Sequence, residues 1–215
     1  MTNSFLDMQN MIAFDLRGVN TAIETGFQVH IQEAIRWAIS LVDSELFYFN
    51  SKVSYTITNP NQELADYYQL PVDYSSIVCN PAIKDDNGKI IRILEKLSNN
   101  DLDLLNMSGG KGLPMYFTII NDQLRLGPTP NASYRVTINY VFKFPPLVSD
   151  DDTNAWLNEA SDYVRFKADS RLAVVPLRNA RMASEVMPFA MEALGALRSK
   201  TLDWLSLESI IPNDL

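Results

Sequence analysis

The side chains best suited to catalysis or metal binding are few in this chain of 215 residues, which holds one histidine, His30, and one cysteine, Cys79. A single histidine cannot build a multi-histidine metal site, and a single cysteine cannot close an internal disulfide. A triad of the serine or cysteine type would have to rest on His30 alone, which borders the apolar face of a predicted helix. The sequence therefore predicts a protein of a reducing compartment without cofactors or a metal, and it removes the Cys/His and Ser/His/Asp catalytic schemes unless His30 serves alone as the base.

Two short segments resemble ligand-binding loops. Residues 150–154 place aspartate or asparagine at alternate positions, as a calcium loop does, but Ala155 and Ser161 stand where that loop needs glycine and glutamate. We interpret this segment as the acidic start of a helix. The glycine-rich residues 109–112 lack the serine or threonine of a phosphate loop and lead into Pro114, so they predict a flexible loop before a hairpin.

Paired carboxylates leave one enzymatic alternative open, because such pairs can meet only in three dimensions. Asp101 and Asp103 are two residues apart and fall on different sides of a helix. Glu185 and Glu192 lie in a pattern typical of an exposed helix surface. A carboxylate-dependent hydrolase is therefore an alternative in which no single carboxylate stands out.

The net charge of −8 is spread unevenly along the chain. Residues 1–50 carry six acids and two bases, residues 51–149 nine of each, and residues 150–215 eleven acids and seven bases. Proteins that grip nucleic acid show a basic patch or stripe, so the sequence predicts no tight binding of DNA. No segment approaches the roughly 20 apolar residues of a membrane span, and the first ten residues lack the features of a signal peptide, so we expect no membrane partner.

Helical periodicity marks both ends of the chain. Apolar residues recur at three- and four-residue spacing from Thr25 to Val42, and a shorter helix is expected before them, at about residues 5–16. Ser161 is a candidate N-cap of a helix that reaches Leu177, and Pro188 predicts a kink or a new helix start. The last long helix carries an apolar stripe formed by Ala183, Val186, Ala190, Leu194 and Leu197.

Strand signals fill the middle of the chain. The aromatic residues 47–50 break the helical period and predict entry into a strand. Val53, Tyr55 and Ile57 alternate with serine and threonine, the period-two pattern of a half-buried strand. Asn121-Asp122 predicts a tight hairpin between two further strands, because both residue types tolerate positive φ.

The order of helices, strands and helices, without alternation of single strands and helices, indicates an α+β fold. We expect N- and C-terminal helices, residues 1–50 and 150–200, to form a helical bundle. An antiparallel β-sheet or sandwich, residues 51–149, is inserted between them, and residues 201–215 form a C-terminal tail.

Several motifs follow one another in a recognisable order. They are Phe47-Tyr48-Phe49-Asn50, Tyr68-Gln69-Leu70-Pro71-Val72-Asp73-Tyr74, Gly112-Leu113-Pro114-Met115-Tyr116-Phe117-Thr118, Leu124-Arg125-Leu126-Gly127-Pro128-Thr129-Pro130, the Pro-Pro-Leu that ends Tyr140 to Leu147, and Asn154-Ala155-Trp156-Leu157. This order resembles that of the head-to-tail adaptors of tailed bacteriophages, including the tubular tail protein A type. The resemblance covers roughly residues 20–200, and Val141-Phe142-Lys143 departs from it where a more tyrosine-rich strand is expected.

The resemblance implies a structural protein of the virion neck or tail, assembled in the host cytoplasm. Such adaptors form homo-oligomeric rings, usually dodecamers, between the portal protein and a tail nozzle or tail-tube protein. The ring extends the channel through which genomic DNA passes during ejection, without specific binding.

An apolar chain end with a tryptophan either folds onto its own core or inserts into a partner. We expect portal binding by five residues of the tail, namely Trp204, Leu205, Leu207, Ile210 and Ile211. Two alternatives stay open at this point. One is a virion-associated cell-wall hydrolase that uses paired carboxylates, and the other is a carbohydrate- or protein-binding module built on Tyr116, Tyr134 and Tyr140.

Overall fold

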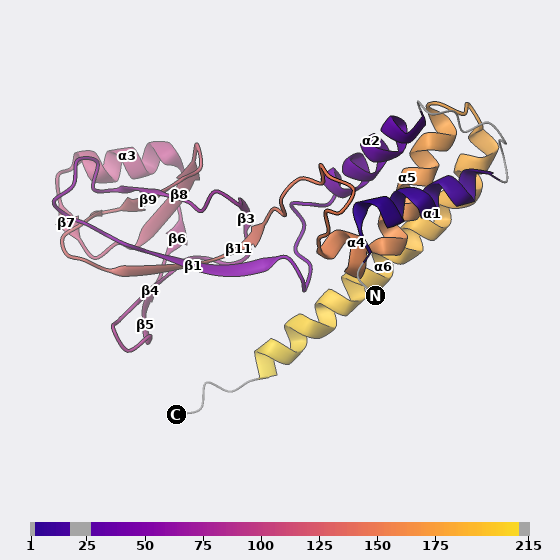
Figure 1. Cartoon of the computed structure of the whole chain (residues 1–215). Coiled ribbons are helices and arrows are strands. Elements are labelled where there is room, and N and C mark those ends of the chain that lie inside the picture. Colours follow the sequence, from indigo (N-terminus) through magenta and orange to yellow (C-terminus); the bar gives the residue numbers. More distant parts are fainter. Residues whose placement is uncertain (1–2, 18–26, 211–215) are drawn as a thin grey trace. The chain divides into compact units, whose positions relative to one another are not determined.

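The chain folds into two units, each with its own core. The computed structural model describes the backbone of residues 3–17 and 27–210 and the side chains of residues 3–16 and 27–206. Residues 1–50 and 144–215 belong to a helical unit, and residues 51–143 to a β unit (Figure 1). The α+β class with helices at both ends, predicted from the sequence, is confirmed.

The helical unit combines helices from both ends of the chain. They are α1 (Phe5–Arg17), α2 (Phe27–Ser40), α4 (Ala155–Glu159), α5 (Ser161–Val174) and α6 (Ala180–Ile210). Helix α5 packs against α6, α2 and α1, so it is the central element of this unit. None of the helices in the described residues is both long and apolar enough to cross a membrane.

The core of the helical unit is apolar and aromatic. Helix α1 contributes Phe5, Met8, Ile12 and Leu16 at the spacing of one helical face, as the sequence predicted. Trp156 lies at the centre and meets the rings of Phe47 and Phe49 edge to face. The remaining buried members come from α2, α4, α5 and α6 and include Ile31, Ile35, Leu157, Val164, Leu172, Leu194 and Leu197.

The β unit contains two main sheets. Its elements are β1 (Ser51–Ile57), β2 (Tyr67–Gln69), β3 (Tyr74–Ile77), β4 (Ala82–Lys84), β5 (Ile90–Ile93), β6 (Glu95–Lys96), α3 (Asn99–Met107), β7 (Lys111–Gly112), β8 (Tyr116–Ile120), β9 (Gln123–Gly127), β10 (Thr129–Pro130) and β11 (Arg135–Phe142). One sheet has the order β1-β11-β4-β5, with β3 also paired to β11. The other has the order β2-β9-β8-β6, and β7 and β10 form a separate pair.

Both sheets face a shared core. It includes Ile83, Val136 and Ile138 from the first sheet and Phe117 and Leu124 from the second. Helix α3 packs on strands β8 and β9 of the second sheet (Figure 1). The β unit is entered and left through neighbouring strands, because Ser51 of β1 lies opposite Val141 of β11.

Several local predictions hold at residue level. Asn121 and Asp122 form the β8–β9 hairpin turn with φ values of 49° and 56°. Ser98 caps α3, because its hydroxyl accepts the N–H of Asp101.

The expected entry into a strand after the aromatic residues is confirmed, because β1 begins directly after Asn50. Residues 47–50 themselves form a turn, in which the side-chain oxygen of Asn50 accepts the N–H of Phe47 and the backbone N–H of Asn50 donates to the Phe47 carbonyl. Two predictions about helix ends were wrong. Helix α5 begins at Ser161 without a side-chain cap and ends at Val174. Helix α6 continues through Pro188, so no new helix starts at this proline.

Candidate interaction surfaces

The segment expected to bind the portal is the end of helix α6. Residues 201–210 continue the helix that begins at Ala180. Trp204 and Leu205 are half-buried and Leu202 is 66% exposed, so a row of apolar side chains is open to a partner here. For Leu207 and Ile210 the structure describes only the helical backbone, and Ile211 lies outside the described residues.

Two contacts fix α6 just before this segment. Thr201 is buried, donates its hydroxyl to the Leu197 carbonyl and accepts the backbone N–H of Tyr48. The guanidinium of Arg198 forms a double hydrogen bond with Glu45, at 2.6 and 2.8 Å. The helix is therefore held to the turn before β1 up to Thr201, and the residues after it are free of this anchor.

Glu159, Tyr48 and Lys200 form a polar cluster beside the same turn. The Tyr48 hydroxyl donates to Glu159, and Lys200 donates to the Tyr48 oxygen at 2.6 Å. The hydrogen bond from Tyr48 is the main cause that lowers the pKa of Glu159. Burial, followed by the carboxylate of Glu159, raises the pKa of Tyr48. The cluster links α4 to α6 through an ionised carboxylate and an ammonium.

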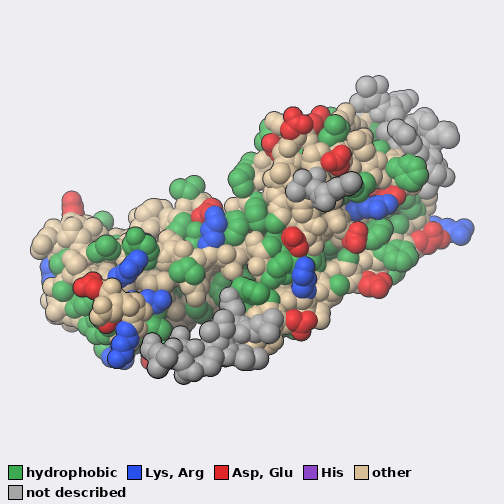
Figure 2. Space-filling view, turned by 60° about the horizontal axis from the view of Figure 1, so that its bottom comes forward, with side chains coloured by type: hydrophobic (Ala, Val, Ile, Leu, Met, Phe, Trp, Pro, Cys, Tyr) green, Lys and Arg blue, Asp and Glu red, His purple; other side chains and the backbone are tan. Residues whose placement is uncertain are grey.

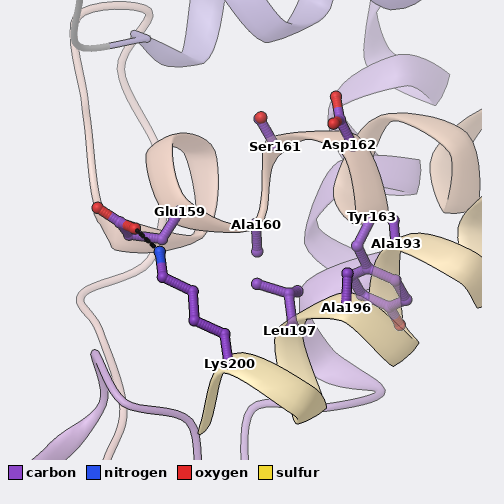
Figure 3. Close-up of a pocket in the computed structure, with 9 residues that line it drawn as sticks. All are labelled: Glu159, Ala160, Ser161, Asp162, Tyr163, Ala193, Ala196, Leu197 and Lys200. Atoms are coloured by element: carbon purple, nitrogen blue, oxygen red, sulfur yellow. Dashed lines mark hydrogen bonds and ion pairs between the residues drawn. The ribbon is translucent and has the colours of Figure 1, made fainter. Parts of the chain in front are cut away.

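A pocket of about 230 Å³ adjoins this cluster (Figure 3). Its lining combines Glu159 of α4 and Lys200 of α6, which point toward each other, with small side chains, namely Ala160, Ser161, Ala193 and Ala196. Sites for small molecules usually measure ~300–1,000 Å³ and enclose most of the ligand. The pocket is smaller than that range, so we treat it as a packing gap between helices.

A buried carboxyl group lies between α1 and α5. Asp169 is only 2% exposed, and one of its oxygens has no hydrogen-bond partner among the described residues. Burial, the charge of Asp15 and a hydrogen bond with Asp15 raise the pKa of Asp169 to about 8, against the opposing charge of Arg165. Arg165 in turn holds Asp15 through two bonds of 2.5 and 2.6 Å. Asp15 and Asp169 therefore connect α1 to α5. Because Asp169 is buried, a polymer substrate such as a cell-wall glycan could not reach this pair of carboxyl groups.

The other candidate acids of the sequence are engaged in local structure. Asp101 belongs to the cap of α3, and Asp103 binds Arg125 of β9 at 2.7 Å. Glu185 pairs with Arg181 along α6 at 2.9 Å, and Glu192 is exposed. Within the described residues, no three potential ligands among His, Cys, Asp and Glu come together to hold a metal.

The three tyrosines of the binding-module alternative do not share a surface. Tyr140 is buried in the β core, where its hydroxyl donates to Asp73 at 2.9 Å. Tyr116 is in the second sheet, and Tyr134 is in the segment before β11 with its hydroxyl on Asn131. The sequence alone could not separate core tyrosines from surface ones, because both follow the same alternation.

The structure adds an apolar surface that sequence reasoning missed. Val53, Tyr55 and Ile57 of β1 are 69%, 56% and 61% exposed, so the apolar side of this strand faces away from the core. In β5, Ile90 and Ile93 are 49% and 56% exposed. The run Ile90-Ile91-Arg92-Ile93 was the available signal, since three isoleucines in four residues are unusual on a solvent-exposed strand.

The two units differ in net charge. The helical unit carries 17 acidic and nine basic side chains, whereas the β unit carries nine of each. The net charge of −8 therefore belongs to the helical unit. On the face that Figure 2 shows, charges of both signs are scattered among hydrophobic side chains, without a continuous basic field.

The comparison with protein families covers both units. The model of the SU10 adaptor protein family matches residues 3–200, and it ends before Trp204 and Leu205. No curated protein sequence matches the chain. Since the match spans nearly the whole chain, the protein belongs to the SU10 adaptor protein family and is a phage adaptor, a structural class of protein.

Proposed function

We propose that this protein is a head-to-tail adaptor that forms a homo-oligomeric ring, a dodecamer, between the portal and the tail of a phage virion. The family match over residues 3–200 is the observation that carries this proposal. The ring sits in the virion neck and is assembled in the host cytoplasm. It binds the portal protein on one side and a tail nozzle or tail-tube protein on the other, and its lumen extends the DNA channel.

Support for the portal contact comes from the end of α6. This end carries half-buried Trp204 and Leu205 beside exposed Leu202, beyond the anchor at Thr201. A partner that covers such side chains gains hydrophobic free energy of roughly 1.5–3 kcal/mol for each side chain that becomes fully buried. Repetition around a ring multiplies modest contacts into a stable attachment.

Support for passage of DNA comes from charge. The helical unit has eight more acids than bases, and several of its acids, such as Glu192 and Asp203, are exposed. Carboxylates repel phosphates, so an acidic channel wall lets the duplex slide, whereas a basic wall would hold it.

Electron microscopy of the protein mixed with its candidate portal tests the proposal. We expect a stacked ring on the portal with twelve copies of the chain. A lone monomer with an enzymatic turnover that one carboxylate substitution abolishes would overturn it.

The portal contact needs a variant that keeps Thr201 in place. A chain that ends at Asp203 retains the anchor and loses the expected contact residues, as does the milder Leu205→Glu. Both should fold normally and lose portal binding in a pull-down assay. The control is Leu104→Glu, at a side chain of the β unit that is 68% exposed. Undiminished binding by both α6 variants would refute the placement.

DNA repulsion is tested on the same protein. Lysine at positions 192 and 203 (Glu192→Lys with Asp203→Lys) should create salt-dependent DNA binding that the wild-type protein lacks, measured by fluorescence anisotropy at ~50 mM salt. In a virion, the same double variant should slow DNA ejection. An unchanged ejection rate would remove the electrostatic part of the proposal.

A further inference from the structure

The exposed apolar residues of the β unit lie at the two opposite edges of one sheet. In the order β1-β11-β4-β5, β1 and β5 are the outer strands. Among the described residues, β1 pairs only with β11, and β5 pairs only with β4. Each strand therefore has one edge whose N–H and C=O groups are open to another chain.

The register places the exposed side chains of both edges on one face of the sheet. Residues directly opposite each other point to the same side. Tyr55 lies opposite Thr137, Thr137 opposite Ala82, and Ala82 opposite Ile93. This outer sheet face thus has apolar side chains at its margins, while β11 and β4 contribute polar, charged or small residues to its centre. One of them is Arg135, whose guanidinium lies 4.1 Å from the centre of the Tyr55 ring.

In strand β1 the apolar side chains lie on the face of the sheet that points away from the core, and the polar side chains lie on the core face. Its core-facing residues are Lys52, Ser54 and Thr56, opposite Tyr140, Ile138 and Val136 of β11. In one copy alone, more than half of the surface of Val53, Tyr55 and Ile57 is exposed to water, and a row of exposed apolar side chains of this kind is typical of a contact with another chain.

The usual protection of an edge strand is weak here. Charged side chains, prolines and bulges normally prevent edge pairing. The single charge in β1, Lys52, is held on the core side by Asp73 at 2.6 Å and lies 3.9 Å from the centre of the Phe142 ring. In β5, Arg92 faces the other side from Ile93, with its guanidinium 3.8 Å from the sulfur of Met115.

The strand directions match those of a second copy. Between β1 and β5 the chain direction reverses three times, because each neighbouring pair in the order is antiparallel. Strand β5 therefore runs antiparallel to β1. Two copies side by side in the same orientation would bring β5 of one against β1 of the next as an antiparallel pair.

From these edges we infer that the β unit joins neighbouring copies by pairing β5 of one copy with β1 of the next. The contact is head to tail, the kind that closes into a ring when the rotation between copies allows it. It rests on the proposed ring and deepens it by naming the surface between subunits. Edge pairing places Val53, Tyr55 and Ile57 beside Ile90 and Ile93, whereas packing of one face on another would bury the polar centre.

The experiment compares assembly of full-length variants that each carry one lysine on the outer sheet face. Tyr55→Lys and Ile93→Lys alter the two margins, and Thr137→Lys alters the centre as a matched control. Far-UV circular dichroism confirms folding, and sedimentation velocity over a concentration series measures assembly. The series extends to ~1 mM, which is the effective concentration of two binding sites joined by a short linker. We expect the margin variants to associate roughly 100-fold more weakly than the wild type, because an unpaired ammonium would be buried, while Thr137→Lys assembles normally.

Hydrogen exchange supplies a second readout. In the assembled wild type, peptides that cover residues 51–57 and 90–93 should both exchange more slowly than in Ile93→Lys.

The possible outcomes separate the two proposals. Normal assembly of both margin variants, or protection of only one of the two strands, overturns the edge pairing and leaves the adaptor function standing. Dissociation of Thr137→Lys together with the others would indicate packing of whole faces and also overturns it. A wild-type chain that stays monomeric over the whole series overturns the edge pairing, whereas the absence of a stacked ring on the portal in electron microscopy overturns the adaptor function.

Discussion

Replacing Asp169 by asparagine should make the stability of the helical unit far less sensitive to pH. Burial and the charge of Asp15 raise the pKa of Asp169 from an ordinary 3.8 to about 8. The folded chain therefore keeps a proton on this carboxyl over a pH range in which the unfolded chain has lost it. A group with a raised pKa stabilises the fold at low pH, and this contribution is lost as the pH rises through about 4 to 8.

The size of the effect follows from the gap between the two pKa values. At about 1.4 kcal/mol per pKa unit, a gap of about four units corresponds to about 6 kcal/mol. This is an upper bound, because the side chains of Asp15 and Arg165 around Asp169 can rearrange when Asp169 becomes charged. We expect the wild type to lose at least ~2 kcal/mol of unfolding free energy between about pH 5 and pH 9.

Urea unfolding followed by tryptophan fluorescence measures this loss. All three tryptophans, Trp37, Trp156 and Trp204, belong to the helical unit, so the signal reports that unit alone. Asp169→Asn should match the wild type near pH 5 and exceed it at pH 9. Asp151→Asn, an exposed carboxyl on the same unit, should keep the wild-type slope. Equal pH dependence in the wild type and Asp169→Asn would refute the reasoning.

Three further predictions concern the β unit and are checked by urea unfolding followed by circular dichroism, with tryptophan fluorescence as the internal reference for the helical unit. Arg125→Met should lower the free energy of unfolding by about 3–5 kcal/mol, because the side chain of Arg125 is 4% exposed and its loss leaves the carboxylate of Asp66 without its ion-pair partner. Asp103→Asn, at a half-exposed partner of Arg125, should lower it by less than ~1 kcal/mol. Equal losses in the two variants would contradict this difference. Gly127→Ala should destabilise by about 1–3 kcal/mol, because a Cβ there would lie 2.6 Å from a methyl group of buried Leu102, and a neutral result would show that α3 moves aside. Ser98→Ala should cost ~1 kcal/mol through loss of the N-cap, and an unchanged midpoint would mean that packing alone holds α3 in place.

The sequence was sufficient for the class of the fold and for features governed by local rules. Helix α1 was predictable because its buried residues follow one face, and the β8–β9 turn because Asn121 and Asp122 tolerate positive φ. No new helix starts at Pro188 for a physical reason: the rest of α6 packs on α5, and this packing outweighs one missing hydrogen bond.

Features that depend on distant contacts could not be predicted. The alternation of apolar and polar residues in β1 predicts a strand, but it does not determine whether Val53 or Ser54 faces the core. Asp15 and Asp169 are far apart along the chain, and only the packing of α1 on α5 brings them together. For Tyr140 the sequence left core packing and an exposed aromatic both open, and the second sheet of the β unit decides in favour of burial.

The side-by-side entry and exit of the β unit has a consequence for biosynthesis and for engineering. Helices α1 and α2 leave the ribosome first, yet their main partner α5 follows only after residues 51–143 have been made. The inserted unit can therefore complete its own fold while the early helices still wait for theirs. Because Ser51 and Val141 lie one strand spacing apart, roughly 5 Å, a short loop could replace the insert and leave a helical protein that is easier to study.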